Sequence, residues 1–155
     1  MRGLVFLCAP FVLSLLSALS IFAQARSVAI TVDDLPYAGG ALAGANAASE
    51  ASSAAELFNR KLLAAFHAHH VPVTGFVIQK YVEALGAKAG PGILKEWIRG
   101  GFDLGNHTYS HLDINDLSPE QIEQEIVRGE STLGPLMKEA GKKPEFFRFP
   151  MNHFP

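Results

Sequence analysis

The chain has 155 residues and carries 13 Lys and Arg against 15 Asp and Glu, which gives a formal net charge of −2. No basic stripe with interleaved aromatic residues runs through it, so the attraction that drives binding to a phosphate backbone is missing and nucleic acid is excluded as a partner. The one cysteine, Cys8, excludes a disulfide framework and leaves nitrogen and oxygen as the ligand atoms of any metal site.

The N-terminus has the pattern of an export signal. Arg2 is followed by the apolar run 3–22 and then by small residues at Ala23 and Ala25. This pattern predicts a secretory signal peptide over residues 1–25 and a mature protein that is periplasmic or secreted, with no stable membrane span after cleavage. A membrane anchor is the alternative, because the apolar run is nearly long enough to span a bilayer.

Residues 26–155 are expected to form one α/β domain. Its first predicted strand, 27–32, is rich in β-branched residues and ends at two carboxylates. A long loop over 38–53 runs into a helix whose pattern strengthens from Ala54, and 71–78 forms the second strand. The apolar face of that helix is expected to contain Leu57, Phe58, Leu62, Ala65 and Phe66.

A further helix and two further strands complete the predicted elements, together with a long capped helix. The helix 93–99 ends before a glycine pair, and the third strand, 102–105, follows it. Ser118, with proline and glutamine after it, predicts the capped start of a helix that Gly141 ends. The buried stripe of that helix is expected to contain Ile122, Ile126, Leu133 and Leu136. Residues 146–149 form the fourth strand.

Strands that alternate with helices at this spacing favour a parallel sheet with right-handed crossovers. The 130 residues that follow residue 25 are few for a closed barrel of this class, which takes about 250, and five residues follow Pro150 at the end of the fourth strand. We therefore expect an α/β fold with parallel strands in a truncated or fragmentary sequence that stops soon after the fourth strand.

Polar side chains follow three of the predicted strands at the points where each strand ends. Asp33 and Asp34 follow the first strand, His107 and His111 the third, and Arg148 closes the fourth. Because the C-terminal ends of parallel strands lie on one face of the sheet, these side chains are expected to converge there.

Two histidines and one carboxylate supply three metal ligands and leave positions open for water and a substrate carbonyl, as a hydrolytic zinc site requires. The same ligand set suits iron or cobalt, so the spacing does not fix the metal. In a regular strand Asp33 and Asp34 point to opposite faces, so the strand is expected to end there, with one carboxylate on the metal and the other on its water. Thr108 occupies the place of the catalytic Glu of a zincin, which excludes that class of metalloprotease.

Three motifs, in order along the chain, resemble those of the polysaccharide deacetylase family, the NodB-homology carbohydrate esterases of family four. Residues 31–36, Thr-Val-Asp-Asp-Leu-Pro, are similar to the family's Thr-Phe-Asp-Asp-Gly-Pro. Residues 107–111 match its His-Ser/Thr-x-x-His, and residues 148–150 match the start of its Arg-x-Pro-Tyr. Each motif is modest, but their order and spacing together are specific.

The resemblance implies a fold, the N-terminal part of a distorted (β/α) barrel of the NodB-homology type, truncated after the fourth strand. It also implies a role for each of these residues. Asp33 would be the general base and Arg148 would orient it, while Asp34, His107 and His111 would hold a divalent metal, first Zn²⁺ and otherwise Co²⁺ or another divalent ion. The substrate would be an N- or O-acetylated glycan such as a chitin oligosaccharide or peptidoglycan. The substrate-binding residues would be Pro150 and Met151, whose neighbouring backbone N–H would stabilise the oxyanion. Tyr109, which lies within the second motif, is also predicted to bind the substrate, with a purely structural role as the alternative.

The chain also departs from the family pattern. Leu35 replaces a glycine in the first motif and Met151 replaces a tyrosine in the third. The family's fourth and fifth motifs, which include a histidine that acts as general acid, have no counterpart before Pro155. Two alternatives therefore stay open: a related hydrolase of other non-peptide C–N bonds, and an inactive remnant that only binds metal or glycan.

Other histidines and aromatic residues receive structural interpretations. His67, His69 and His70 lie where a helix ends, and no carboxylate motif accompanies them, so a second metal site is not expected. The aromatic residues expected in the core are Phe58, Phe66, Phe76 and Trp97. Residues beside the motifs that either line the sugar groove or serve the fold are Tyr37, Asn106 and Asn152.

Overall fold

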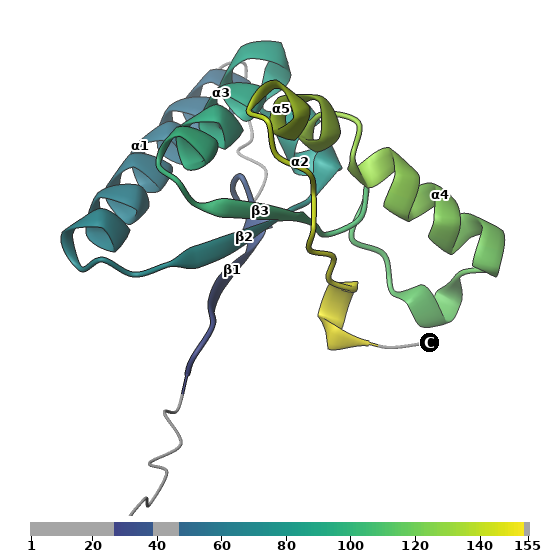
Figure 1. The fold of residues 1–155 in the computed structure, drawn as a ribbon. Coiled ribbons are helices and arrows are strands. Elements are labelled where there is room, and N and C mark those ends of the chain that lie inside the picture. Colours follow the sequence, from purple (N-terminus) through teal and green to yellow (C-terminus); the bar gives the residue numbers. More distant parts are fainter. Residues whose placement is uncertain (1–26, 39–46, 154–155) are drawn as a thin grey trace, which may run out of the picture.

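A three-stranded parallel sheet forms the centre of the protein (Figure 1). The computed structural model describes residues 27–38 and 47–153, so the predicted signal peptide lies outside the described residues. The strands are β1 (Ile30–Leu35), β2 (Val73–Val77) and β3 (Asp103–Asn106), in the order β1-β2-β3. In the part of the chain that is described, no helix has the length and apolar character needed to cross a bilayer.

The expected fourth strand is reduced to one bridge. Phe147 pairs in parallel with Asn106 on the outer edge of β3. The Asn106 N–H donates to the Phe146 carbonyl at 2.9 Å, and the Arg148 N–H donates to the Asn106 carbonyl at 3.0 Å. The segment that contains Arg148 is thereby fixed beside the end of β3, although it does not form a regular strand.

Five helices connect and cover these strands. They are α1 (Ala47–Ala68), α2 (Gln79–Ala84), α3 (Gly86–Arg99), α4 (Pro119–Gly129) and α5 (Leu133–Glu139). Figure 1 shows α1, α3 and α5 side by side over one face of the sheet. Two short 3₁₀ turns, η1 (Ile114–Asp116) and η2 (Pro150–Asn152), follow the histidine motif and the arginine motif, respectively.

The hydrophobic core lies between the sheet and these helices. Trp97 of α3 is fully buried and makes edge-to-face contacts with Phe66 and Phe102 at ring separations of 6.1 and 5.8 Å. Phe76 is also buried, but it points to the other face of β2, toward His107 and Arg148. Alternation along β2 therefore divides its side chains between the core and the candidate site.

A buried polar residue sets the orientation of α1. Asn59 has no exposed surface; its side-chain carbonyl accepts from the Trp97 indole N–H at 2.8 Å and its amide donates to the Pro36 carbonyl at 2.7 Å. The buried face of α1 therefore contains Ala55, Asn59 and Leu63, and the expected core position of Phe58 is wrong, because that ring is 46% exposed. Apolar periodicity alone assigns the wrong buried face to this helix, because the true buried face contains an asparagine.

Three helix boundaries differ from those expected. The helix α1 begins at Ala47 rather than near Ala54, and α3 begins at Gly86 rather than Ile93, even though Pro91 lies inside it. The single helix expected between Ser118 and Gly141 is two helices, α4 and α5. Pro135 explains this break, because in a continuous helix its ring would collide with the carbonyl four residues earlier.

Two expected helix ends are confirmed. Ser118 and Gln121 form a capping box: the serine hydroxyl accepts from the Gln121 N–H, and the glutamine side chain accepts from the Ser118 N–H. Gly141 follows α5 with a φ of 71°, the left-handed conformation that glycine adopts readily.

Candidate metal centre

The acidic pair is placed by an irregularity in β1. The strand does not end before the carboxylates, as expected, but continues through them to Leu35. Val32 pairs with Gly75 and Leu35 pairs with Val77, so three steps along β1 match two along β2. This extra residue is a β-bulge, and Asp34 within it has a φ of 61°. The bulge overrides strict alternation and lets both carboxylates reach one end of the sheet.

The histidine motif follows β3 in a tightly bonded loop. The Asn106 side-chain carbonyl accepts from the Thr108 N–H at 2.8 Å, and the Thr108 hydroxyl accepts from the His111 N–H at 3.2 Å. Thr108 and His111 have φ values of 72° and 59°. Left-handed backbone costs about 1–3 kcal/mol at each non-glycine residue and is found mainly where the surroundings enforce it, often at functional sites.

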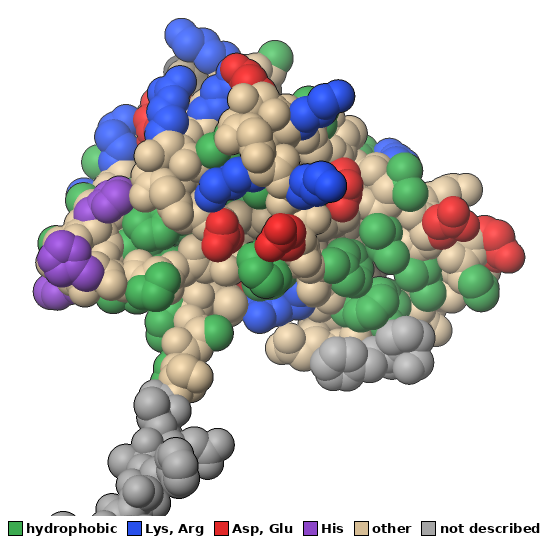
Figure 2. Space-filling view, in the orientation of Figure 1, with side chains coloured by type: hydrophobic (Ala, Val, Ile, Leu, Met, Phe, Trp, Pro, Cys, Tyr) green, Lys and Arg blue, Asp and Glu red, His purple; other side chains and the backbone are tan. Residues whose placement is uncertain are grey.

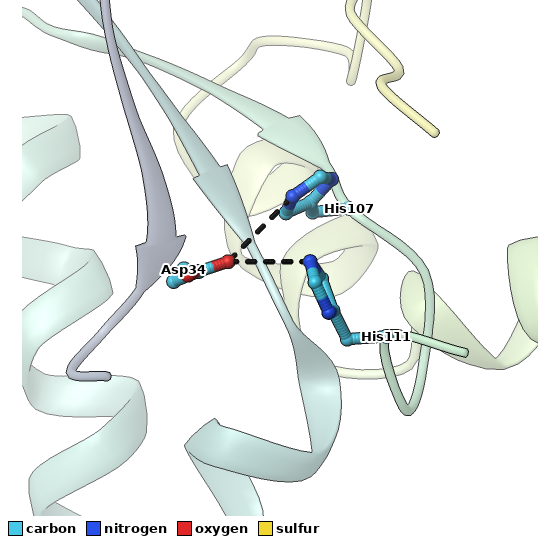
Figure 3. Close-up of side chains that lie close together, drawn as sticks. All are labelled: Asp34, His107 and His111. Atoms are coloured by element: carbon cyan, nitrogen blue, oxygen red, sulfur yellow. Dashed lines mark ion pairs between the residues drawn. The ribbon is translucent and has the colours of Figure 1, made fainter. Parts of the chain in front are cut away.

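Three predicted ligands meet at one point (Figure 3). The Asp34 Oδ1 atom lies 3.6 Å from His107 Nε2 and 3.5 Å from His111 Nε2, and the three potential ligand atoms all lie within 4.8 Å of one another. Two atoms bound tetrahedrally to one zinc ion at about 2.0–2.1 Å are separated by roughly 3.4 Å. The separations to Asp34 are therefore those of ligands that share an ion, and they are long for direct hydrogen bonds.

The Asp34 carboxylate provides an independent test of whether a cation fits. Its side chain is 37% exposed as a whole, but its Oδ1 atom is buried and has no hydrogen-bond partner. A buried carboxylate oxygen without a partner is costly. A cation between Asp34 and the two imidazoles would remove that cost, so the residues present fit a divalent metal.

The surroundings of His107 favour its neutral form. Its Nδ1 atom lies 2.8 Å from the Arg148 carbonyl, which only accepts, so Nδ1 carries the proton and Nε2 is left with a lone pair toward Asp34. Burial is the largest effect on this ring and lowers the pKa of His107 below its ordinary value of 6.5, against a smaller raising effect of the Arg148 carbonyl. Both features favour metal binding.

Arg148 connects the acidic pair to the rest of the site. Its Nη1 atom donates to Asp33 Oδ1 at 2.7 Å and to Thr31 Oγ1 at 3.0 Å, and its guanidinium lies 4.2 Å from the centroid of the Phe76 ring. Asp33 is thus bound to Arg148 while the neighbouring Asp34 faces the histidines. The spacing of the sequence did not show which carboxylate would face the histidines. In the structure Asp34 faces them and Asp33 bonds to Arg148.

The residues expected to bind substrate are placed less uniformly. Pro150 is buried at the start of η2, and Met151 is 53% exposed with a φ of 56°. Tyr109 donates from its hydroxyl to Glu83 at 3.0 Å, and the Arg128 guanidinium lies 3.6 Å above its ring. Tyr109 therefore joins the histidine loop to α2 and α4.

The three residues with open interpretations also differ. Asn106 is 1% exposed and serves the fold, since its amide donates to the Ile126 carbonyl and its carbonyl accepts from Thr108. Tyr37 packs beside Phe58 at 6.1 Å, and Asn152 lies exposed in η2. The sequence signal for this structural role is the position of Asn106, directly before His107.

The histidines near the end of α1 do not belong to a group of metal-binding side chains in the described part of the chain. Figure 2 shows histidine side chains gathered at one end of the molecule, where His67, His69 and His70 lie at the end of α1. Within residues 27–38 and 47–153, the grouping of three or more metal-binding side chains consists of Asp34, His107 and His111.

Comparison with known proteins identifies a family that matches most of the chain and curated relatives that match part of it. The sequence model of the polysaccharide deacetylase family matches residues 23–155. A peptidoglycan-N-acetylglucosamine deacetylase of Bacillus cereus is 31% identical over 93 residues, which are 60% of this chain and 31% of that protein. A chitooligosaccharide deacetylase of Sinorhizobium fredii is 26% identical over 84 residues, which are 54% of this chain and 37% of that protein. The matched regions thus span about a third of each curated relative.

A solved structure supports the fold independently. A family 4 carbohydrate esterase from Streptomyces lividans, in complex with acetate, matches with a TM-score of 0.58 at 22% identity, over 83% of this chain and 53% of that chain. The expected α/β fold with a parallel sheet, of the NodB-homology type, is confirmed. From its three motifs, its fold and the family match over residues 23–155, the chain belongs to the polysaccharide deacetylase family.

Proposed function

We propose that the protein is an exported, metal-dependent hydrolase that removes acetyl groups from N- or O-acetylated carbohydrates. The observation that carries this proposal is the convergence of Asp34, His107 and His111 around a buried, unpartnered carboxylate oxygen. The family membership and the deacetylases among the relatives support it. Acetylated chitin oligosaccharides and peptidoglycan are the proposed substrates.

In this proposal Asp34, His107 and His111 hold a divalent cation, with Zn²⁺ as the first candidate. When bound, such a cation supplies Lewis acidity that acidifies water and polarises the acetyl carbonyl. The ligand atoms are nitrogen and oxygen, which Co²⁺ and other divalent ions also accept.

Asp33 acts as the general base and takes the proton from the attacking water. Arg148 keeps the Asp33 carboxylate oriented through the 2.7 Å bond and is itself fixed by Thr31 and the Phe76 ring. Met151 is exposed in the η2 turn, and a backbone N–H beside it is proposed to stabilise the developing oxyanion. Pro150 begins that turn, and both Pro150 and Tyr109 are proposed to contact the sugar.

Acetate release from acetylated chitin oligosaccharide and from peptidoglycan tests the activity. We expect release with added Zn²⁺ or Co²⁺, loss on chelation, and a loss of about 10²–10⁴-fold in Asp33→Asn with metal affinity retained. Asp116→Asn, an exposed carboxylate in η1, is the matched control. Metal binding without release of acetate from either glycan would defeat the deacetylase proposal and favour a hydrolase of another C–N bond or a binding protein.

Export is proposed from residues 1–25 and is tested separately. Expression in a bacterium with a periplasm should yield a protein whose N-terminal sequence begins at Arg26. An N-terminus that retains residues 1–25 in the membrane fraction would favour an anchor instead.

A further inference from the structure

We infer that Glu125 is a positioning residue that holds His111 in the geometry required for metal binding. The inference rests on the proposed metal centre and adds to it a residue that lies outside the three motifs. Glu125 belongs to α4, and its carboxylate binds the histidine loop twice: Oε2 accepts from the Ser110 N–H at 2.7 Å and Oε1 accepts from the Ser110 hydroxyl at 2.9 Å.

The two proposed histidine ligands are supported in different ways. The His107 ring is oriented through its own Nδ1 atom, which bonds to the Arg148 carbonyl. Among the described residues, the His111 ring has no comparable hydrogen bond to a second group; its contacts are with Asp34 and the His107 ring. The direction of the His111 ring therefore depends on its backbone.

That backbone is strained and needs external support. Thr108 and His111 both have positive φ values, and Ser110 lies between them, immediately before His111. The Ser110 N–H belongs to the peptide plane that joins Tyr109 to Ser110. By fixing this N–H and the hydroxyl of the same residue, Glu125 holds the residue that directly precedes His111, while the Thr108 hydroxyl accepts from the His111 N–H.

The helix α4 is itself fixed against the same loop. The Asn106 amide donates to the Ile126 carbonyl at 2.8 Å, and Gly129 packs directly on the Asn106 side chain. The loop is also held from the opposite side, because the Lys80 N–H at the start of α2 donates to the Tyr109 carbonyl at 2.8 Å. Glu125 thus anchors the histidine loop, which has little regular structure of its own, to a helix whose position is fixed.

Glu123 of the same helix offers a matched control. Its side chain is exposed, and among the described residues no hydrogen bond or ion pair joins that side chain to another group. Replacing Glu123 or Glu125 by alanine removes the same charge from the same helix, but only the second change removes the two bonds to Ser110.

The test is the affinity for Zn²⁺, measured in competition with a chromophoric chelator, with thermal unfolding of the metal-free proteins as the control for folding. We expect Glu125→Ala to weaken Zn²⁺ binding by about 10–100-fold, the usual effect of removing a partner that orients a ligand. Glu123→Ala should bind as the wild type does. Glu125→Gln retains an acceptor for the N–H and a group for the hydroxyl, so its affinity should lie closer to wild type than to Glu125→Ala.

Three outcomes would overturn the inference. They are wild-type affinity in folded Glu125→Ala, an equal loss in Glu123→Ala, and a loss in Glu125→Gln as large as in Glu125→Ala, which would assign the effect to charge rather than to position. If Glu125→Ala does not fold, Ser110→Ala, which removes one of the two bonds, takes its place: weaker binding supports the inference and unchanged binding overturns it. Failure of the wild type to bind any divalent metal would instead defeat the proposed metal centre.

Discussion

Arg148 makes contacts that a lysine would not reproduce. Its planar guanidinium bonds to Asp33 and Thr31 from one nitrogen while its face lies over the Phe76 ring, and a lysine ammonium is a compact charge without that face. We predict that Arg148→Lys lowers the rate of acetate release about 10–100-fold through misorientation of Asp33. Metal affinity should stay unchanged, because the backbone carbonyl that binds His107 remains.

Separate measurements of acetate release and Zn²⁺ affinity check this prediction, with the exposed Arg99→Lys as the control. A parallel loss of rate and metal affinity would contradict it, since that result would mean that the side chain supports the metal ligands rather than the base.

The lowered pKa of His107 predicts how the metal-free protein responds to acid. Because the folded ring has a pKa below 6.5, the unfolded chain takes up this proton first as the pH falls. The free energy of unfolding should therefore decline as the pH drops below about 6.5, beyond the decline due to other groups. Urea unfolding of the metal-free protein at about pH 7.5 and pH 5.5 measures the effect.

His107→Asn isolates the contribution of this ring. The asparagine amide can replace Nδ1 as a donor to the Arg148 carbonyl, but it takes up no proton in this range. The loss of stability between the two pH values should be smaller in His107→Asn than in the wild type. An equal or larger loss would show that His107 is not the group responsible.

The convergence of Asp34, His107 and His111 could be predicted from the sequence, but the different positions of the two carboxylates could not be derived from spacing. Asp34 lies at the C-terminal end of β1, His107 and His111 follow β3, and parallel strands bring such residues together. Which of Asp33 and Asp34 faces the histidines depends on the bulge in β1, and a bulge changes the facing of side chains without a clear sequence signal. The resemblance to the family made the assignment that the pattern alone left open.

At the scale of the elements, α4 requires close contact with the strand end beside it. A Cβ atom on Gly129 would collide with the Asn106 carbonyl oxygen and would lie 2.9 Å from the Thr108 carbonyl carbon. The φ of Gly129 is not positive, so alanine there is penalised by contact and not by backbone strain. We predict that Gly129→Ala lowers the free energy of unfolding by about 1–3 kcal/mol and weakens Zn²⁺ binding, because Asn106 brackets the histidine loop.

Gly134→Ala is the matched control for this prediction. At Gly134 in α5 the nearest atom to a new Cβ is 3.8 Å away, so the helix should gain up to about 1 kcal/mol from the usual preference for alanine over glycine. Urea unfolding and Zn²⁺ titration of both variants measure the difference. Equal stability of the two variants would show that α4 can move away from Asn106 at no cost.

Elements with strong local signals were predictable, and those set by tertiary contacts were not. The capping box at Ser118 fixes the start of α4 from three neighbouring residues. The start of α1 lies in a stretch of small residues with no apolar period, and the face it buries includes Asn59, which a hydrophobic pattern rejects. The apolar stripe predicted from Ile122 to Leu136 spans two helices in the structure. The prediction missed the break because apolar periodicity continues across it.

At the scale of the whole molecule, the parallel direction of the strands was the most predictable feature. Alternating strands and helices imply a parallel sheet, and the structure has the order β1-β2-β3 with a final bridge at Phe147. The candidate centre combines residues from the first and third strands of this order, Asp34 near the end of β1 and the histidines after β3. A metal ion there would connect segments about seventy residues apart, so its binding should stabilise the fold as a whole.

Removal of metal should therefore lower the stability of the wild type, and Asp34→Asn should abolish this dependence. At a metal concentration one hundred times Kd, binding to the folded state adds about 2.7 kcal/mol. Without metal, Asp34→Asn should be at least as stable as the wild type, because it replaces a charged oxygen that is buried without a partner. Thermal unfolding with Zn²⁺ and with chelator, beside the Asp116→Asn control, separates the two effects. A metal-free Asp34→Asn protein that is clearly less stable than the control would mean that Asp34 serves the fold itself, whereas the orphaned oxygen argues that it serves the ion.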